Sequence, residues 1–571
     1  MDFTFNSRRS VVHSKKGMAA STQPLASSVG VKILENGGNA AMAAVGMAAA
    51  MGVLEPQMTG LGGDVFSLYY DAKTKHVYGI NGSGHSPRAV SVDLLRKEGV
   101  VGPRIPASSI HSITVPGAVA AWCDVVEKWG NGKMTLGEIL QPAIDLAGDG
   151  FPVSAISSNM WVNGRQKLLN ASPNGKELLN ENGEAPAEGE FFVNKNMAAT
   201  LQRIASQGRD GFYKGFTGDA IIETLKARGG VMTHQDLTDH ESTFVEPISL
   251  SLDDKVRLHE IPPNGQGLVA LIALGIIKQL DQQHVIDLKS LKHNSVEYLH
   301  LISECLKFAF KDGEEYITDY DRMDYNVEHF LSEEYLAERA KLFDPKKVNK
   351  DFDHGVLNPK HRSDTAFFTC SDSEGNACSF IASLYTGFGS GVVPEGCGFA
   401  LQNRGSNFNL TPGTRNCLEG GKRPYHTIIP AMLTNEKDSS LYATYGVMGG
   451  FMQPQGHLQV LINLSLFGLN PQAALDAPRL CLNSDPDSED NGLGADSPVS
   501  TAETTVALED GISEDVIKGL EELGHKVKLV KGGARGVFGR GQVIRATMSN
   551  NRLVYSAGSD LRGDGCAIAE I

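Results

Sequence analysis

The stretch that decides the fold is SDTAFFTCSDSEGNACSF, residues 363–380, almost two thirds of the way along the chain. Its residue order predicts a strand, a tight turn containing glycine and a returning strand. The hairpin begins with Asp-Thr and holds short polar residues among its phenylalanines, which leaves two interpretations of Thr365. It is the first residue of an ordinary strand, because threonine suits half-buried pleated surfaces, or it is a nucleophile that becomes active once the chain is cut before it.

Length and composition favour a globular protein and argue against nucleic acid as a partner. By length alone the 571 residues suit roughly three or four domains, or one large layered domain with elaborations. Of these residues 41% are hydrophobic, 21% charged and 7% aromatic, which is typical of a soluble globular protein. The net charge is −15, from 52 basic and 67 acidic residues, and no dense Lys/Arg stripe with interleaved aromatic residues is present. We therefore expect no nucleic-acid partner.

The start of the chain and the cysteines indicate the cellular compartment in which we expect the protein. The first stretch, MDFTFNSRRSVVHSKKGMAAS, contains basic residues but no apolar segment of signal-peptide length. No run of about 18 apolar residues occurs, so we expect no membrane-spanning helix. The eight cysteines have neither CxxC spacing nor histidine companions, which argues against zinc and against a disulfide framework. These features predict a reduced, cytoplasmic protein that holds no metal.

The rest of the chain predicts helices first, then strands paired with helices. Residues 21–54 should form two helices, the second of them buried because it is apolar on most sides. Largely helical segments are predicted at 114–148 and 293–312, and a final pair of strands around Ser-Asn-Asn at 549–551. The acidic stretch NSDPDSEDNGLGADSP, residues 483–498, is expected to be a solvated loop. This order predicts an α+β fold whose sheets pack between helical layers.

Several common catalytic signatures are absent from the sequence. It contains no G-x-S-x-G, no G-x-x-x-x-G-K-[ST] and no H-E-x-x-H, and GxGxxG appears only in incomplete form. Serine–histidine–aspartate catalysis, a metal centre and a nucleotide cofactor therefore lose support, and we expect no cofactor.

Motifs spread over nearly the full length identify a family. In order, they are GMAAS, ILENGGNAAMAAV, EPQMTGLGGDVF, the hairpin from Thr365, GFGSG, GKRP, the pair Gly449-Gly450 and GSDLRGDGCAI near the end. With these motifs the chain resembles the γ-glutamyltranspeptidase family of N-terminal-nucleophile hydrolases. The resemblance extends to the cephalosporin-acylase-like members, which often lack a signal peptide.

The resemblance implies that the chain is a zymogen that cuts itself between Asp364 and Thr365. Residues 1–364 then form the large subunit and residues 365–571 the small one. The two fragments are expected to associate as a heterodimer, or a higher oligomer of it. Together they are expected to build the four-layer αββα sandwich of N-terminal-nucleophile hydrolases.

Threonine has the chemistry that this processing needs. Its hydroxyl attacks the carbonyl of Asp364, an N-to-O acyl shift gives an ester, and water releases the new chain end. The freed α-amine, with a reference pKa near 8, then serves as the base for its own hydroxyl. No histidine is required, which agrees with the absence of a triad motif.

The resemblance gives catalytic roles to three further residues. Ser383 stands where the family usually has a second threonine, across the hairpin from Thr365, where its hydroxyl can orient the nucleophile. Gly449 and Gly450 precede an amphipathic helix and are expected to form an oxyanion hole with their N–H groups. The alternative for Ser383 is a purely structural hydrogen-bonding role. The alternative for Gly449 and Gly450 is a simple strand-to-helix turn.

The substrate pocket departs from the family pattern more than the nucleophile region does. Ser83 stands at the position of an arginine that pairs with the α-carboxylate of a γ-glutamyl group. The other expected substrate-binding positions carry Tyr385, Arg404, Asn407, His426 and Thr427, where the family usually has Asn, Gln, Asp and a pair of serines.

These changes affect charge recognition. Ser83 cannot replace a bidentate carboxylate clamp, and Asn407 offers a buried ammonium only a dipole. Arg404 or Arg88 can bind the carboxylate from another direction, or each is an ordinary surface or structural arginine. His426 is expected to add a charge that changes between about pH 6 and 7.

Two classes of function follow. The first is an autoprocessing amidohydrolase or acyltransferase that cleaves γ-glutamyl, glutathione-type amides through an acyl-enzyme on Thr365 and passes the acyl group to water or an amine. Within it, the alternative is an acylase that acts on non-glutamyl acyl amides. The second class is an unprocessed relative that acts as a binding protein.

Overall fold

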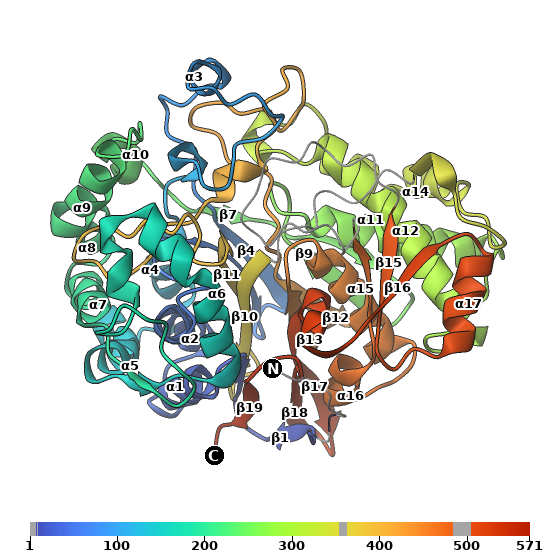
Figure 1. Ribbon diagram of the computed structural model, residues 1–571. Coiled ribbons are helices and arrows are strands. Elements are labelled where there is room, and N and C mark those ends of the chain that lie inside the picture. The colour runs from blue at the N-terminus through green and yellow to red at the C-terminus, as the bar shows by residue number, and fades with distance from the viewer. Residues whose placement is uncertain (1–6, 8, 353–362, 484–503) are drawn as a thin grey trace.

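Two antiparallel sheets lie at the centre of the protein, with helices on either side of the pair (Figure 1). The computed structural model describes residues 7, 9–352, 363–483 and 504–571. The acidic stretch predicted to be a solvated loop lies, from residue 484 on, outside the described residues. Helices and sheets together confirm the predicted α+β class.

The first sheet has seven strands. In spatial order these are β1 (Val12–Ser14), β18 (Arg552–Ser559), β17 (Arg540–Ser549), β13 (Leu441–Met448), β12 (Ala431–Asn435), β9 (Val256–Glu260) and β8 (Ile248–Ser251). The predicted pair of strands around 549–551 is β17 and β18, and Asn550 and Asn551 adopt the positive φ that their tight turn requires.

The second sheet also has seven strands and contains the hairpin. In spatial order these are β19 (Cys566–Ala569), β2 (Met18–Ser21), β10 (Ser363–Ser371), β11 (Ala377–Thr386), β3 (Asp64–Asp71), β4 (His76–Gly82) and β7 (Thr243–Val245). The predicted hairpin is thus confirmed as β10 and β11. Both large sheets combine strands from before and after residue 365.

Alternating side chains place three apolar cores around these sheets. On β10, Phe367 belongs to the core between the two sheets, whereas Phe368 packs with the helices outside the second sheet. On β12, Met432 and Leu433 divide in the same way between the inter-sheet core and the helices outside the first sheet. Successive strand residues point to opposite faces, so strands buried on both faces show no polar alternation.

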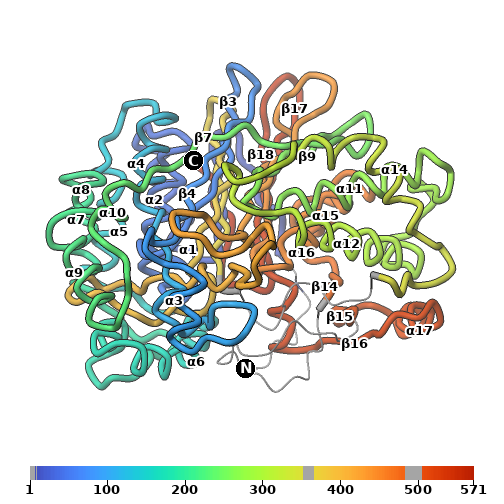
Figure 2. The backbone as a smooth tube through the Cα atoms, turned by 90° about the horizontal axis from the view of Figure 1, so that it is seen from above, coloured from blue at the N-terminus to red at the C-terminus, as the bar shows by residue number. Residues whose placement is uncertain are grey.

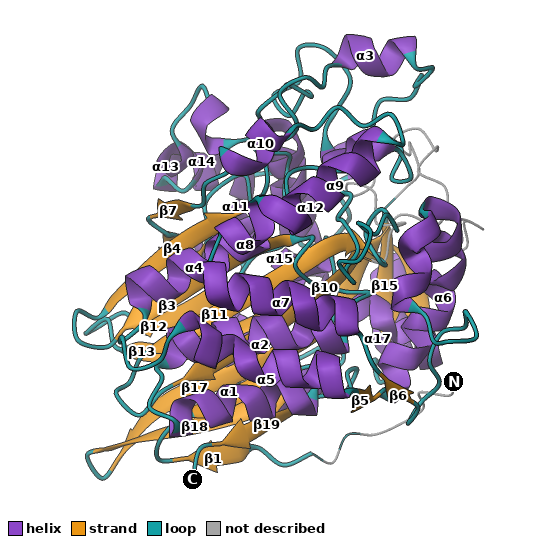
Figure 3. Cartoon of the chain, turned by 90° about the vertical axis from the view of Figure 1, so that its left-hand side faces the viewer, coloured by secondary structure: helices purple, strands orange, loops and turns teal. Residues whose placement is uncertain are grey.

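Helices of the first group lie beside the second sheet, as Figures 2 and 3 show. They are α1 (Pro24–Glu35), α2 (Ala40–Leu54), α4 (Ala118–Trp129), α5 (Leu136–Asp149), α6 (Ala155–Ala171), α7 (Lys195–Gln207), α8 (Asp210–Tyr213), α9 (Gly215–Lys226) and α10 (His234–Thr238). The two helices predicted in 21–54 are α1 and α2, and every residue of α2 is buried. Asn39 caps α2 by accepting a hydrogen bond from the backbone N–H of Met42.

Helices of the second group lie beside the first sheet. They are α11 (Gly267–Gln282), α12 (Val296–Tyr316), α13 (Val327–Phe330), α14 (Glu333–Ala340), α15 (Met452–Ser465), α16 (Pro471–Asp476) and α17 (Glu514–Glu522), while α3 (Val92–Lys97) lies apart from both groups, at the top of Figure 1. A small sheet of β14 (Leu480–Asn483), β15 (Thr505–Glu509) and β16 (Lys526–Val530) and the pair β5 (Phe151–Pro152) and β6 (Phe191–Phe192) complete the strands. Among the described residues, no helix is long and apolar enough to cross a membrane.

Candidate active site

The hairpin brings Thr365 and Ser383 together. Their backbones are opposite each other in the β10–β11 register, and the Thr365 hydroxyl donates a hydrogen bond of 3.1 Å to Ser383 Oγ. The register shifts between Asp364, which pairs with Tyr385, and Thr365. Such an irregularity bends a strand and redirects a side chain next to it. The expected cleavage bond therefore lies at the one register shift of this hairpin, and both hydroxyls are buried.

Arg404 connects Ser383 with Thr427. It lies in a short 3-10 turn, Arg404–Asn407, after β11. Its Nη2 donates to Ser383 Oγ at 3.1 Å, and its Nη1 donates to Thr427 Oγ1 at 2.7 Å. Three of the predicted site residues are thus joined to Thr365 through one chain of hydrogen bonds.

The Arg404 guanidinium is fully buried. It lies over the ring of Tyr385, with 4.5 Å between its Cζ and the ring centroid, which favours a cation there. Burial lowers the pKa of Arg404 to about 10, so the side chain stays charged at neutral pH. Its Nε makes no hydrogen bond with the described residues, and the nearest carboxylate oxygen, Asp64 Oδ2, is 3.9 Å away. Arg404 is therefore neither a surface arginine nor one side of a tight ion pair.

Asp64 is a site residue that the sequence interpretation missed. It begins β3 directly after a Gly-Leu-Gly-Gly run, a signal that could have pointed to it. Its carboxylate accepts hydrogen bonds from the Gly84 N–H at 2.8 Å, from Gln402 Nε2 at 3.2 Å and from His426 Nε2 at 2.9 Å. Burial raises its pKa to about 7, although Arg404 opposes this rise.

His426 does not provide the charge that was expected of it. It is fully buried against Phe66, its Nε2 faces Asp64, and its Nδ1 accepts from the Ile428 N–H at 3.3 Å. Burial, reinforced by Arg404, holds the pKa of His426 well below its usual value. The expected change of charge between about pH 6 and 7 is therefore wrong: the imidazole stays neutral and bonds to Asp64.

The glycine pair lies at the end of β13, directly before α15. Gly449 and Gly450 have φ angles of 132° and 60°, which favour glycine. Within the described part of the chain neither N–H donates a hydrogen bond, as an oxyanion hole requires. Gln266 donates from Nε2 to the carbonyls of both Gly450 and Thr427, and so ties the glycine turn to the Arg404 network.

The remaining residues considered for substrate binding differ in their burial and in their hydrogen-bond partners. Tyr385 is buried beside Arg404 with a φ of 81°. Asn407 is buried; its Nδ2 donates to the Tyr425 carbonyl, and its Oδ1 has no hydrogen-bond partner among the described residues. Ser83 is held by Asn81 at 2.7 Å. Arg88 pairs on the surface with Asp239 at 2.6 Å, so it is an ordinary surface arginine and not the carboxylate clamp.

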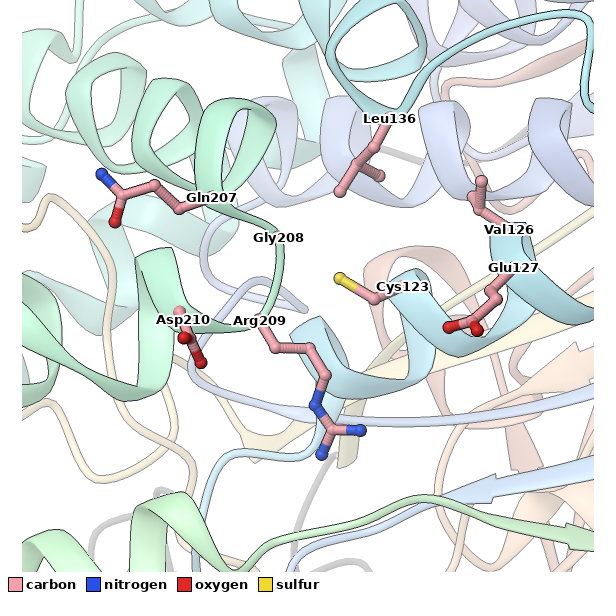
Figure 4. A pocket seen from close by; sticks show the side chains of 8 residues that line it. All are labelled: Cys123, Val126, Glu127, Leu136, Gln207, Gly208, Arg209 and Asp210. Atoms are coloured by element: carbon pink, nitrogen blue, oxygen red, sulfur yellow. The ribbon is translucent and has the colours of Figure 1, made fainter.

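Two features elsewhere in the protein share no residue with this site. A hollow of about 380 Å³ lies at α4 and the α7–α8 turn, and Cys123 points into it (Figure 4). Burial raises the pKa of the Cys123 thiol to about 12, so it is no thiolate nucleophile. A buried group of His300, Glu304 and His525 has metal-type ligand atoms, but the two imidazoles bond to each other and the Lys307 ammonium is 2.7 Å from Glu304.

Comparison with known proteins shows similarity to one family over nearly the whole chain. The profile of the family described as Gamma-glutamyltranspeptidase matches residues 26–570. The chain is 34% identical to the glutathione hydrolase-like YwrD proenzyme of Bacillus subtilis (strain 168) over 98% of this chain and 99% of that protein. It is 31% identical to the oxamate amidohydrolase proenzyme of Klebsiella pneumoniae subsp. pneumoniae over 97% and 98%.

A solved structure gives the same result for the fold. The crystal structure of cephalosporin acylase from Bacillus halodurans covers 99% of this chain and 98% of its own, with a TM-score of 0.85 and 37% sequence identity. Family profile, relatives and fold agree over nearly the whole length. The chain belongs to the γ-glutamyltranspeptidase family of amidohydrolase enzymes.

Proposed function

We propose that the chain is a proenzyme that cleaves itself before Thr365 and then hydrolyses or transfers amide-linked acyl groups. One observation carries the proposal: Thr365, at the register shift of a buried hairpin, donates to Ser383. The names of the two curated relatives, both proenzymes, support it. The new chain end would begin in β10, between β2 and β11. Both fragments contribute to both sheets, so we infer a heterodimer that keeps the four-layer αββα sandwich.

The proposed self-cleavage uses the Thr365 hydroxyl. Its oxygen gives up a proton and attacks the carbonyl carbon of Asp364. The C–N bond then breaks, the nitrogen takes up a proton and becomes the α-amine, and an ester remains. Water hydrolyses the ester, which leaves a carboxyl group on Asp364 and restores the Thr365 hydroxyl.

Turnover reuses the same oxygen. The free amine removes the hydroxyl proton, and the oxygen attacks the substrate carbonyl. The N–H groups of Gly449 and Gly450, which donate to no other group among the described residues, stabilise the oxyanion that develops. The amine part of the substrate leaves with a proton, and water or an amine acceptor releases the acyl group from Thr365.

Two donor classes are candidates. Glutathione-type γ-glutamyl amides are the family default, and the second class is non-glutamyl acyl amides. The second is favoured by the neutral side chains at the expected γ-glutamyl contacts, since Ser83 is held by Asn81 and Asn407 carries no charge to pair with an ammonium. One relative bears the name oxamate amidohydrolase, which also supports a non-glutamyl donor.

All eight cysteines are unpaired in the structure. This supports the proposal of a reducing, cytoplasmic location, because structural disulfides form mainly in oxidising compartments.

The test is a time course of freshly purified protein, followed on a denaturing gel and by amide turnover. We expect two fragments to appear together with activity, and γ-glutamyl anilides to be poor donors beside simple acyl amides. A protein that stays whole and inactive would support the binding-protein alternative. A protein that stays whole and hydrolyses amides would show that Thr365 is not the nucleophile.

A further inference from the structure

The charge of Arg404 is poorly compensated. Its two Nη atoms donate to neutral hydroxyls, those of Ser383 and Thr427, and its Nε has no hydrogen-bond partner in the described part of the chain. The carboxylate of Asp64 is 3.9 Å from Nε and is itself held by His426, Gly84 and Gln402. A buried cation without a close anionic partner is costly unless an anion joins it.

A second arginine adds to this positive charge. Arg104 is partly buried, and its charge acts on Tyr385 and Tyr425. Among the described residues its side chain has neither an ion pair nor a hydrogen bond. Two guanidinium groups therefore lie near Tyr385, and neither has an acid in close contact.

We propose that the acyl part of the substrate ends in a carboxylate that Arg404 binds, with Arg104 as the second cation, and that the substrate is a monoamide of a short dicarboxylic acid. This inference rests on the function proposed above. It assigns to Arg404 the anion binding that Ser83 cannot perform. A planar guanidinium suits a carboxylate, because it offers parallel N–H donors.

The hydrogen-bond chain indicates that a short substrate is sufficient. Two bonds of 3.1 Å each, through Ser383 Oγ, separate Thr365 Oγ1 from Arg404 Nη2, so these atoms are at most about 6 Å apart. A carboxylate bound there lies close to the scissile carbonyl. At about 1.5 Å per C–C bond, a spacer of about three carbon atoms is long enough to join the two groups.

The same contacts exclude an ammonium partner. Asn407 offers only a neutral oxygen, and Asp64 is enclosed by its three donors. The amide of a plain diacid therefore fits better than a γ-glutamyl group. Hydrolysis consumes one water and releases the dicarboxylic acid and ammonia, or an amine.

The test compares matched amides on the self-processed wild-type enzyme. Succinamate and butyramide differ in the carboxylate, while glutaramate and L-glutamine differ in the α-amino group. We expect kcat/KM for succinamate to exceed that for butyramide by at least about a hundredfold, and glutaramate to be a better substrate than L-glutamine. Equal values for succinamate and butyramide would overturn the carboxylate proposal, whereas the proposed amidohydrolase function would stand. Absence of both self-cleavage and turnover of every amide would overturn both.

Variants locate the anion site. Arg104→Gln should raise KM for succinamate about tenfold more than KM for butyramide, and Arg404→Gln should abolish the preference for succinamate. Arg88→Gln, which removes a surface arginine paired with Asp239, is the matched control and should change neither value. An unchanged succinamate preference in Arg404→Gln would overturn the assignment.

Inhibition of the wild-type enzyme gives a test that does not depend on whether the Arg404→Gln chain cleaves itself. Free succinate should compete with the substrate on the wild-type enzyme at least about tenfold more strongly than butyrate. Arg104→Gln should reduce this difference, because one of the two cations is lost. Equal inhibition by succinate and butyrate would overturn the proposal.

Discussion

Two buried clusters in this protein each combine arginine and acidic side chains, but they differ in how closely the opposite charges pair. In the first, Arg404 contacts neutral hydroxyls and approaches Asp64 only to 3.9 Å. The second lies around β14, β15 and the chain after β18. There Arg562 bonds to both Asp560, at 2.9 Å, and Glu509, and Arg479 bonds to the other oxygen of Asp560 at 2.8 Å.

The pKa values of the two aspartates express this difference. Burial raises the pKa of Asp64 to about 7, because Arg404 compensates too little. Burial would also raise that of Asp560, but Arg479 and Arg562 lower it to about 2. Close pairing thus makes the second cluster a structural element. The first retains uncompensated positive charge next to the nucleophile, as a binding site for an anion needs.

The largest expected effect concerns the first cluster. Thr365→Ala should leave the fold nearly unchanged but abolish self-cleavage and reduce turnover by at least about 10⁴-fold, because no other oxygen takes its place. Thr365→Ser should retain part of both activities, since it keeps a hydroxyl on the same backbone position. Gel analysis and amide turnover of both variants check this. Full turnover by Thr365→Ala would require another nucleophile.

Neutralising one aspartate of each cluster tests the comparison directly. Asp560→Asn should lower the free energy of unfolding by about 3–5 kcal/mol, because it removes the buried carboxylate that both Arg479 and Arg562 contact. Asp64→Asn should cause no such loss at pH 7, because burial raises the pKa of the Asp64 carboxyl to about 7 and its ionisation costs the folded protein stability. Urea unfolding of the unprocessed Thr365→Ala chain measures both.

The exposed Asp239, partner of Arg88, supplies the control. Asp239→Asn should change stability by no more than about 0.5 kcal/mol, as expected of a surface pair. If Asp64→Asn costs as much as Asp560→Asn, the two clusters do not differ in the way described.

Local features of the sequence predicted the parts of the structure that depend on neighbouring residues. The hairpin, its turn and the approach of Thr365 to Ser383 follow from strand pairing across a short loop. The two helices of 21–54 follow from their caps and apolar pattern. These interactions span few residues, so composition and spacing reveal them.

The charges of the site could not be predicted in this way. Asp64, Arg404 and His426 come from three separate segments, and their pKa values depend on complete burial. His426 was expected to titrate because histidine ordinarily does so near neutral pH. Arg404 was open to a surface or structural interpretation because nothing near it in the sequence shows what covers it.

The pH dependence of stability should have opposite signs in the two clusters. Asp560 has a folded-state pKa of about 2, below its ordinary 3.8, so its contribution is complete above about pH 4 and is lost as the pH falls toward 2. The difference between wild type and Asp560→Asn should shrink by about 2 kcal/mol over that range.

Asp64 should show the reverse trend. Its folded-state pKa lies above 3.8, so its carboxyl destabilises the folded protein increasingly as the pH rises from about 4 to about 7. Asp64→Asn should therefore gain stability relative to wild type over that range. Urea midpoints at several pH values measure both trends, and parallel curves for the two variants would contradict them.

The smallest expected loss of turnover tests how Arg404 is connected to the nucleophile. Ser383→Ala removes the oxygen that accepts from both Thr365 and Arg404 and should reduce turnover about tenfold, the value of one hydrogen bond. Ser383→Thr keeps the hydroxyl and should retain most activity. Equal turnover of Ser383→Ala and wild type would remove Ser383 from the account.

The most direct test of the central claim, that Thr365 becomes the N-terminal nucleophile, is the N-terminal sequence of the small fragment. From the mass of 61.2 kDa, cleavage before Thr365 gives fragments of about 39 and 22 kDa, scaled by length. We predict that the smaller fragment begins Thr-Ala-Phe-Phe-Thr. A small fragment with another N-terminus, or an intact chain with full amide turnover, would contradict the account.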